Sequence, residues 1–562
     1  MKRRKKVTDP QKLEQTQFWA QIRNIFIRMG FVHLNTREKN MTLNGNPSDV
    51  DALFIMDNLI LTCEDTIGNA DKSEHIRKAN DWARIINENQ DEFISEIKRI
   101  TNSDPFEKYR NKQLRIIHLY CSKNKIESDV KIRFGNLVYL SEHDIRYFDY
   151  LTRRIKKSAR FEMLRFLDIK IEDMHPFDSA ITNREYRSVR WEALGNTVIK
   201  FEMVSFMISP QDIIEQGYIL RKEGWSSQAY QRMLLKNKLQ SIRKYVATTN
   251  STFANNIIAT LPRETSISEI RDEKGNNIPC LAKISIPYRY NSICIIDGQH
   301  RVFAYHEDDN DPYENKIKDL RKERQLLLTG IIFPDEITDA KRIKFEAKLF
   351  LDINDKQTKV EPRLIQELEV VLDPFSKLAI AKRVVDNLNE REPFKDALAV
   401  YWYDKEKIKV ASIVGYGNLR DLISISKKEL DKKNLFDYWE PEGEEKEKLL
   451  NGAGSISDLD LYTEYCAKCV SIYFSAIKEV FDDMWTADKK KSRLLTTISI
   501  NGFIYALMKH VEKYGICDFK TYRRDLSNIP NVIPFSKEKF EYTGSQWVKL
   551  GIRIFEEMER NH

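Results

Sequence analysis

Ser292-Ile293-Cys294-Ile295-Ile296 is followed directly by Asp297-Gly298-Gln299-His300-Arg301 and then by Val302-Phe303-Ala304-Tyr305. The first five residues are a nearly continuous apolar run, which is typical of a strand buried on both faces. The last four begin a helical segment. A polar pentapeptide thus lies between a buried strand and a helix, and this order predicts an α/β fold for the middle of the chain.

The pentapeptide has the residue types of a phosphate-binding turn. A glycine lets the backbone approach a ligand closely, and the first turn of the next helix offers N–H groups to an anion. We expect nucleotide or phosphate contacts from Gly298, Gln299, His300 and Arg301, and catalytic roles for Asp297, as metal ligand or general base, and for His300. The alternative is a hydrogen-bonded structural turn in a binding module.

Strands and helices are predicted on both sides of this turn. Further strands are expected at 199–207, 256–260, 282–286 and 326–332, with helices at 211–219 and 228–246. After Val360 the pattern becomes almost wholly helical. An acidic stretch at 439–458 interrupts it and indicates a linker or an exposed, flexible loop.

A second α/β pattern precedes the middle region. Helical spacing of apolar residues covers 11–30 and 72–100, strand-like segments cover 114–121 and 136–140, and a helix-rich tail runs from about 142 to about 190. Two apolar runs at 52–56 and 59–63 flank Asp57-Asn58, which suits a tight hairpin. The chain is therefore expected to be a multidomain α/β protein with domains at 1–195, 196–365 and 366–562, the last of them helical.

Acidic residues gather at the open end of the predicted hairpin. If Asp57-Asn58 is a two-residue turn, Asp51 faces Glu64, Asp49 faces Thr66, and all four share one face. Opposed carboxylates about 5 Å apart repel unless a cation neutralises them. Oxygen ligands suit Mg²⁺ or Mn²⁺, so we expect Asp51, Glu64 and Asp49 to bind metal and the first two to be catalytic. Alternatively, all three acids are solvent-facing residues at strand ends.

This order of helix, acidic hairpin and following helix resembles the PD-(D/E)xK nuclease fold. Asp51 matches the family's aspartate and Glu64 the acid of its (D/E)xK triplet. Thr66 stands where that family carries the lysine that helps to activate water. The resemblance implies either an active metal nuclease, in which Lys72 or Lys78 replaces that lysine, or an inactive DNA-binding relic.

The pentapeptide is the motif that names the DGQHR-domain proteins, which include regulators linked to DNA phosphorothioation. The resemblance runs from Phe201 to about Val360, and its flanking matches include Tyr230-Gln231-Arg232, Arg243, and Phe350 to Asn354 with Gln357. It implies that Arg232, Asn354 and Gln357 join the phosphate-binding set. The turn is also similar to the ParB/sulfiredoxin-like superfamily, in which it holds nucleotide phosphates. Gln299 replaces the sulfiredoxin cysteine, so thiol chemistry is not expected.

The composition limits the class of protein. A net charge of +7 from 92 basic and 85 acidic residues permits nucleic-acid binding without requiring it. No apolar run approaches the length of a membrane span and no signal-peptide pattern is present, so we expect a soluble cytoplasmic protein. Seven dispersed cysteines fit a reducing compartment. Cys466 and Cys469 lack a second ligand pair and are expected to be buried thiols.

Basic residues outside the two sites are candidates for DNA contacts. They are Lys2, Arg3 and Arg4 in a basic N-terminal arm, and Lys489 and Lys490 in a lysine cluster. Either group is alternatively only solvated.

Together these features predict a nucleotide-dependent DNA-processing protein. It is expected to be a nuclease or NTPase of a DNA modification, restriction or anti-phage defence system, using Mg²⁺ or Mn²⁺ and ATP or another nucleoside triphosphate. Its expected partners are DNA and proteins of the same operon, with no membrane. Two alternatives stay open: a non-catalytic DNA-binding regulator that senses a nucleotide or modified base, and an accessory protein for DNA base or backbone modification.

Overall fold

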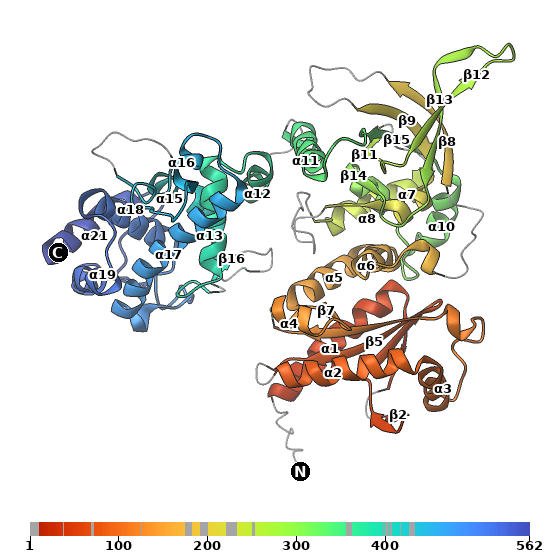
Figure 1. Ribbon diagram of the computed structural model, residues 1–562, viewed down its shortest axis with the longest axis horizontal. Helices are drawn as coiled ribbons and strands as arrows, with labels where there is room; N and C mark the ends of the chain where they lie inside the picture. Colours follow the sequence, from red (N-terminus) through yellow and green to blue (C-terminus); the bar gives the residue numbers. More distant parts are fainter. Residues whose placement is uncertain are drawn as a thin grey trace. The chain divides into compact units, whose positions relative to one another are not determined.

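The structure is a computed structural model of the chain. It describes residues 10–36, 39–68, 72–124, 126, 128–174, 183–191, 201–220, 233–249, 253, 255–355, 362–395, 397–399, 404, 407–415, 417–425 and 433–562. The chain divides into two compact units, Met1–Arg342 and Ile343–His562. The first unit is mixed α/β and the second is largely helical, so the predicted multidomain α/β class is confirmed (Figure 1).

The first unit begins with a five-stranded sheet in the order β1-β4-β5-β6-β7. These strands are β1 Val32–Leu34, β4 Ala52–Met56, β5 Leu59–Thr66, β6 Arg115–Ser122 and β7 Val138–Leu140. The first three pair in antiparallel fashion, and β5, β6 and β7 pair in parallel. The surrounding elements are α1 Pro10–Met29, the hairpin of β2 Met41–Leu43 and β3 Asn46–Ser48, α2 Lys72–Glu88, α3 Gln90–Thr101, α4 Ser128–Arg133, α5 Glu142–Ile155 and α6 Arg160–Phe166.

The two faces of this sheet bury different residues because side chains alternate along each strand. Phe54 of β4 faces α1, where its ring stacks on Phe26 with centroids 4.5 Å apart. Leu53 belongs to a second apolar cluster with Trp82 of α2 and Phe93 of α3. Helix α1 therefore covers one face of the sheet, and α2 with α3 covers the other.

The β4–β5 hairpin has the predicted register. Ala52 pairs with Cys63 and Met56 with Leu59, so partners sum to 115 as expected. Asp57 adopts a φ of +51°, a conformation that Asp and Asn tolerate better than most residues. The turn thereby fixes which side chains oppose each other at the far end of the hairpin.

An eight-stranded mixed sheet follows, in the order β10-β14-β11-β15-β9-β8-β13-β12. Its strands are β8 Asn183–Trp191, β9 Glu202–Ile208, β10 Gly217–Tyr218, β11 Ile257–Thr260, β12 Ser266–Arg271, β13 Asn277–Pro287, β14 Ile293–Asp297 and β15 Leu326–Ile332. Its helices are α7 Pro210–Gln216, α8 Lys236–Thr249, α9 Gln299–Phe303 and α10 Glu314–Glu323. In Figure 1, β12 and β13 form a long hairpin that extends away from these helices.

Most predicted elements of the first unit are present, but several differ. The helix-rich tail to about Arg190 is wrong at its end, where β8 pairs with β9 and β13. Strands β1, β2, β3, β10 and β12 were not predicted, and the helix expected at 72–100 is two helices that meet at Asn89. The errors at β8 and β12 have one cause, because both strands are mostly polar and such strands show little of the apolar pattern that predicts a strand.

The second unit is built from helices around one apolar core. Its helices are α12 Pro362–Leu372, α13 Lys377–Asn389, α14 Val410–Gly415, α15 Asn418–Leu422, α16 Glu445–Leu450, α17 Ile456–Val480, α18 Thr497–Tyr514, α19 Phe519–Leu526, α20 Ile529–Val532 and α21 Trp547–Asn561; α11 Asp339–Asp355 spans the boundary with the first unit, and β16 Leu398–Ala399 pairs with β17 Ile408–Lys409. None of the described helices has the length and apolar character needed to cross a membrane.

Two predictions for this unit meet different outcomes. Cys466 and Cys469 are buried on α17, as expected. The acidic stretch at 439–458 is not simply an exposed loop, because it contains α16 and because Trp439 packs its ring 5.0 Å from that of Tyr462. The acidic composition of this stretch suggested a loop, but the stretch contains a short helix, and the ring of Trp439 packs it against the core.

Candidate functional site

Three side chains form a row across the N-terminal sheet. Asp51 lies just before β4, Glu64 lies opposite it on β5, and Tyr120 on β6 is the direct partner of Glu64 in the parallel register. The backbone N–H of Asp51 donates to Oε1 of Glu64 at 3.4 Å, and that of Asp65 donates to Oδ2 of Asp51 at 3.1 Å. The structure therefore brings Asp51 and Glu64 together as predicted, while Asp49 is exposed beside them.

Glu64 lies in a negatively charged environment made by neighbouring aspartates. Burial raises the pKa of the Glu64 carboxyl well above its ordinary value, and the charges of Asp51, Asp49 and Asp65 raise it further, against a backbone hydrogen bond from Asp51 that lowers it. A raised pKa means that the ionised carboxylate lacks enough nearby positive charge. The residues fit a bound divalent cation, because such an ion would supply that charge to oxygen ligands.

Two residues that the sequence did not reveal lie beside these acids. Nδ1 of His75 on α2 is 2.8 Å from the hydroxyl of Tyr120. Burial lowers the pKa of His75, and the nearby Asp51 opposes this shift. Burial raises the pKa of Tyr120, and Glu64 raises it further. The acidic row therefore carries an imidazole and a phenol at its edge, two groups able to hold or move a proton.

The position of Thr66 has no substitute lysine among the described side chains of α2. Oγ1 of Thr66 accepts from the backbone N–H of Gly68 at 3.3 Å. Lys78 instead pairs with Glu74 at 2.8 Å on an exposed helix face, although its charge contributes to lowering the pKa of His75. Lys72 begins α2, but its side chain lies outside the described residues.

The second predicted site is the turn from β14 into α9. Gly298 has a φ of +104°, a conformation that strongly favours glycine. A Cβ atom at this position would lie 3.1 Å from Cγ1 of Ile257 and 3.1 Å from an Nη atom of Arg301. The glycine is therefore required by the backbone and by its surroundings together.

The polar side chains of this turn are bonded to the protein itself. Nη2 of Arg301 donates to Oδ2 of Asp297 at 2.9 Å and to the carbonyl oxygen of Asn256 at 2.8 Å. Nε2 of His300 accepts from the backbone N–H of Leu235 at 3.1 Å, and Gln299 is buried. An anion at this turn would have to compete with Asp297 for Arg301.

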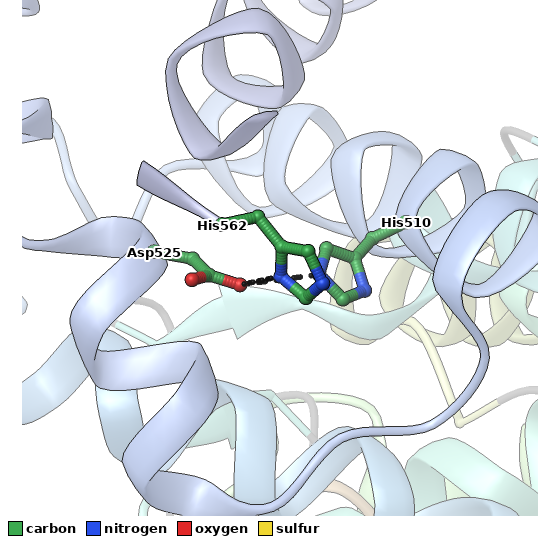
Figure 2. A group of neighbouring side chains, drawn as sticks. All are labelled: His510, Asp525 and His562. Atoms are coloured by element: carbon green, nitrogen blue, oxygen red, sulfur yellow. Dashed lines mark hydrogen bonds and ion pairs between the residues drawn. The ribbon is translucent and has the colours of Figure 1, made fainter. Parts of the chain in front are cut away.

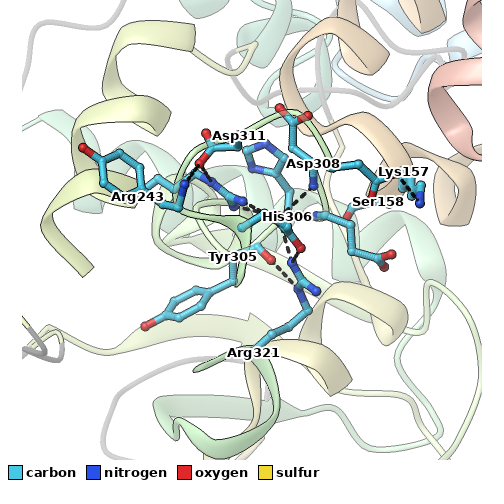
Figure 3. Close-up of polar contacts among 12 residues, drawn as sticks. Lys157, Ser158, Arg243, Tyr305, His306, Asp308, Asp311 and Arg321 are labelled. Atoms are coloured by element: carbon cyan, nitrogen blue, oxygen red, sulfur yellow. Dashed lines mark hydrogen bonds and ion pairs between the residues drawn. The ribbon is translucent and has the colours of Figure 1, made fainter. Parts of the chain in front are cut away.

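A network of two buried arginines supports the chain that follows the turn (Figure 3). Arg243 of α8 is 1% exposed and donates to the carbonyl oxygens of Ala304 at 3.0 Å and His306 at 2.6 Å. Arg321 of α10 donates to the carbonyl oxygens of Tyr305 at 2.6 Å and His306 at 3.1 Å. These bonds fix the backbone just after α9.

Acidic groups balance both arginines. Glu314 accepts from Arg243 through one oxygen and from Arg321 through the other, the latter at 2.8 Å. Asp311 lies 3.2 Å from Nε of Arg243. Burial, with help from Arg243, lowers the pKa of His306 to about 3, so this histidine is neutral. Arg243 therefore has a structural role in the described geometry.

A cavity of about 520 Å³ lies elsewhere in the first unit. Its lining includes Arg160, Arg184, Glu215 and Tyr288, and no residue predicted for either site. Tyr288 donates to Glu215 at 2.5 Å, and burial raises the pKa of Glu215. No sequence pattern predicts this cavity, because its lining residues come from separate segments.

The other predicted site residues lie in the second unit or fall wholly or partly outside the described residues. Lys489 and Lys490 are exposed in a turn of the second unit. Asn354 belongs to α11, but its side chain lies outside the described residues, as do all of Lys2, Arg3, Arg4, Arg232 and Gln357. Their proposed contacts with DNA or phosphate stay predictions.

Comparison with known protein families matches the middle of the chain. Residues 193–360 match the family model DndB, described as DNA-sulfur modification-associated. No curated protein and no solved structure matches the chain. The matched segment contains β9 to β15, the turn at 297–301 and both arginines of the buried network. The middle of this chain is therefore similar to the DndB family of DNA-sulfur modification-associated proteins.

Proposed function

We propose that this protein acts on DNA within a DNA-sulfur modification system and that the row of Asp51, Glu64 and Tyr120 is a phosphodiester-hydrolysing site. The family match supports the setting. The opposed carboxylates of Asp51 and Glu64, with the raised pKa of Glu64, are the observation that carries the chemistry. Two carboxylates this close together at a partly buried position destabilise the fold, and such a cost is typical of a functional site.

Asp51 and Glu64 would hold Mg²⁺ or Mn²⁺, with Asp49 as a further ligand. When bound, such an ion polarises a phosphodiester and activates water. The remaining steps, proton transfer and positioning, are assigned to side chains of the protein. Glu64 would bind the ion as a carboxylate, its proton having passed to solvent. His75, whose pKa is lowered, is neutral at pH 7 and would accept a proton from the attacking water. Tyr120 holds the imidazole in place through its hydroxyl.

The turn at 297–301 is assigned to nucleotide phosphate in this proposal. Arg301 would exchange its bond to Asp297 for a bidentate contact with phosphate, and the released Asp297 would be free to bind a metal ion or act as a base. This exchange would couple nucleotide binding to the position of Asn256, whose carbonyl oxygen Arg301 also holds. ATP or another nucleoside triphosphate is the expected ligand.

The test is cleavage of plasmid DNA, with and without phosphorothioate linkages, by the purified full chain in Mg²⁺ or Mn²⁺. We expect nicking that Asp51→Asn and Glu64→Gln abolish. Glu107→Gln, at an exposed acid of the same unit, is the matched control and leaves activity unchanged. If the wild-type chain neither cleaves DNA nor hydrolyses nucleotide on any of these substrates, the proposal is wrong.

A non-catalytic DNA-binding regulator is the second candidate. Thr66 supports it, because its hydroxyl is bonded to the backbone of Gly68 and no described lysine of α2 replaces the missing one. In that case Asp51→Asn and Glu64→Gln leave biological activity intact, whereas Arg301→Ala abolishes it. Comparing the nucleosides of DNA from cells with and without the protein tests the third reading, an accessory role in modification.

A further inference from the structure

Three side chains from three helices converge in the second unit, far from both sites above in the sequence. They are His510 of α18, Asp525 at the end of α19 and His562, the residue that follows α21. Figure 2 shows both imidazoles directed at the same carboxylate oxygen. His510 and Asp525 are fully buried, and the side chain of His562 is 26% exposed.

The distances between these groups match a metal coordination shell. Nε2 of His510 lies 3.3 Å from Oδ2 of Asp525, and Nδ1 of His562 lies 2.8 Å from the same oxygen. One ligand atom from each of the three residues can be chosen so that all lie within 4.8 Å of one another. Tetrahedral Zn²⁺ with bonds near 2.0–2.1 Å separates its ligand atoms by about 3.4 Å. To reach this separation, the contact between Nδ1 of His562 and Oδ2 of Asp525 has to open by about 0.6 Å.

The surroundings leave one side of the carboxylate to the two imidazoles. Arg524 binds the other oxygen, Oδ1, through Nε at 3.0 Å and Nη2 at 2.9 Å, and its Nη2 is 3.5 Å from Nδ1 of His562. Burial lowers the pKa of His510, with Asp525 opposing this shift. A neutral buried imidazole is the protonation state that ligates metal. The guanidinium of Arg524 offsets the charge of Asp525 through Oδ1 and leaves Oδ2 able to bind a metal ion.

The rings are held in position by packing rather than by these polar contacts alone. The ring of Tyr514 lies 4.1 Å from that of His562, and the ring of Tyr522 lies 5.3 Å from that of His510. Tyr522 is itself buried in the core of the second unit. Preorganised ligand side chains lower the cost of assembling a metal site.

We propose that His510, Asp525 and His562 form a Zn²⁺ site that ties the end of α21 to α18 and α19. Two nitrogens and one carboxylate oxygen are ligands for zinc or a similar transition metal, whereas Mg²⁺ and Ca²⁺ prefer oxygen alone. Water on the exposed side of His562 completes the shell. The site is independent of the proposed DNA chemistry, since none of its residues belongs to the row at Asp51 or to the turn at 297–301.

The test measures zinc bound by the full chain after chelation and dialysis against Zn²⁺. We expect the wild-type chain to retain one more zinc ion per chain than His562→Ala, and Zn²⁺ to raise the melting temperature of the wild type alone. Replacing Zn²⁺ with Co²⁺ should give the visible absorption bands of a nitrogen- and oxygen-ligated tetrahedral ion, absent in the variant.

His562→Ala is chosen because His562 is partly exposed and follows the helix, so its removal leaves the core intact. A melting curve without metal checks this. Repeating the comparison in a Glu64→Gln background removes zinc bound by the acidic hairpin, and the difference of one ion should persist. Equal zinc contents for wild type and His562→Ala, or a melting temperature that Zn²⁺ raises equally in both, would overturn the proposal.

Discussion

Arg301 and Asp297 form an ion pair across the turn of the DGQHR segment, with Nη2 and Oδ2 2.9 Å apart. The same Nη2 atom also reaches the carbonyl oxygen of Asn256 on the chain entering β11. The motif is therefore closed on itself in the described structure. Its two charged ends neutralise each other, and a phosphate ligand would have to displace one of them.

Arg301→Ala is expected to lower the free energy of unfolding by about 1–3 kcal/mol, because it leaves Asp297 and the Asn256 carbonyl without this donor. Urea denaturation measures the change. Arg289→Ala, at an exposed arginine of the same unit, is the control and should change stability by less than about 0.5 kcal/mol. If Arg301→Ala is as stable as the control, the closed turn contributes nothing to the fold.

Gly298→Ala should be more damaging than its size suggests. The added methyl group meets Ile257 and Arg301 at 3.1 Å, in a backbone conformation with φ of +104°. We expect a loss of about 1–3 kcal/mol in the free energy of unfolding. Gly275→Ala is the matched control, since Gly275 also has a positive φ of +83° but nothing lies within 4 Å of its Cβ position. Equal losses in the two variants would show that crowding is unimportant.

Glu64 should make the fold less stable as pH rises. Its pKa is raised in the folded state, so its contribution to stability is fully present below the carboxyl pKa of the unfolded chain and is lost as pH rises through the folded pKa. Glu64→Gln is expected to raise the melting temperature at neutral pH without metal, and to have no such effect near pH 3. Mg²⁺ should raise the melting temperature of the wild type only. A lower melting temperature for Glu64→Gln at pH 7 would contradict this.

His75→Ala is expected to lower kcat for DNA cleavage about 10²–10⁴-fold with little effect on stability, if the imidazole accepts the proton of the attacking water. Lys78→Ala gives the sharper result. The charge of Lys78 contributes to lowering the pKa of His75, so its removal should raise that pKa. The acidic limb of the pH–rate profile should then shift to higher pH, while the plateau value of kcat stays unchanged. A profile that does not move would exclude His75 as the titrating group.

Arg243→Ala should destabilise the first unit by about 3–5 kcal/mol, since it leaves the partly buried Glu314 and Asp311 with less positive charge. Thermal unfolding measures this loss. Lys244→Ala, at the next and exposed position of α8, is the control and should be near neutral. A small effect of Arg243→Ala would show that Arg321 alone can support the backbone after α9.

The sequence predicted the features whose geometry is local. Asp51 faces Glu64 because a two-residue turn fixes the register of the hairpin. The strand, turn and helix around Gly298 follow from a buried apolar run, a glycine with positive φ and a helical pattern in sequence. In both places the deciding contacts join residues a few positions apart, so the order of residue types is enough to specify them.

Tertiary structure decided which distant residues join these features. Tyr120 becomes the neighbour of Glu64 only because β6 pairs in parallel with β5, and His75 reaches Tyr120 only because α2 packs on that face. Strand β8 forms because it pairs with β9 and β13, and its polar sequence does not predict a strand. The three helices that bring together His510, Asp525 and His562 do so by burying apolar faces. Sheet pairing joins the strands and apolar burial joins the helices. Both select partners through the whole fold rather than through sequence neighbours, because burial is not directional and paired strands can be far apart in sequence.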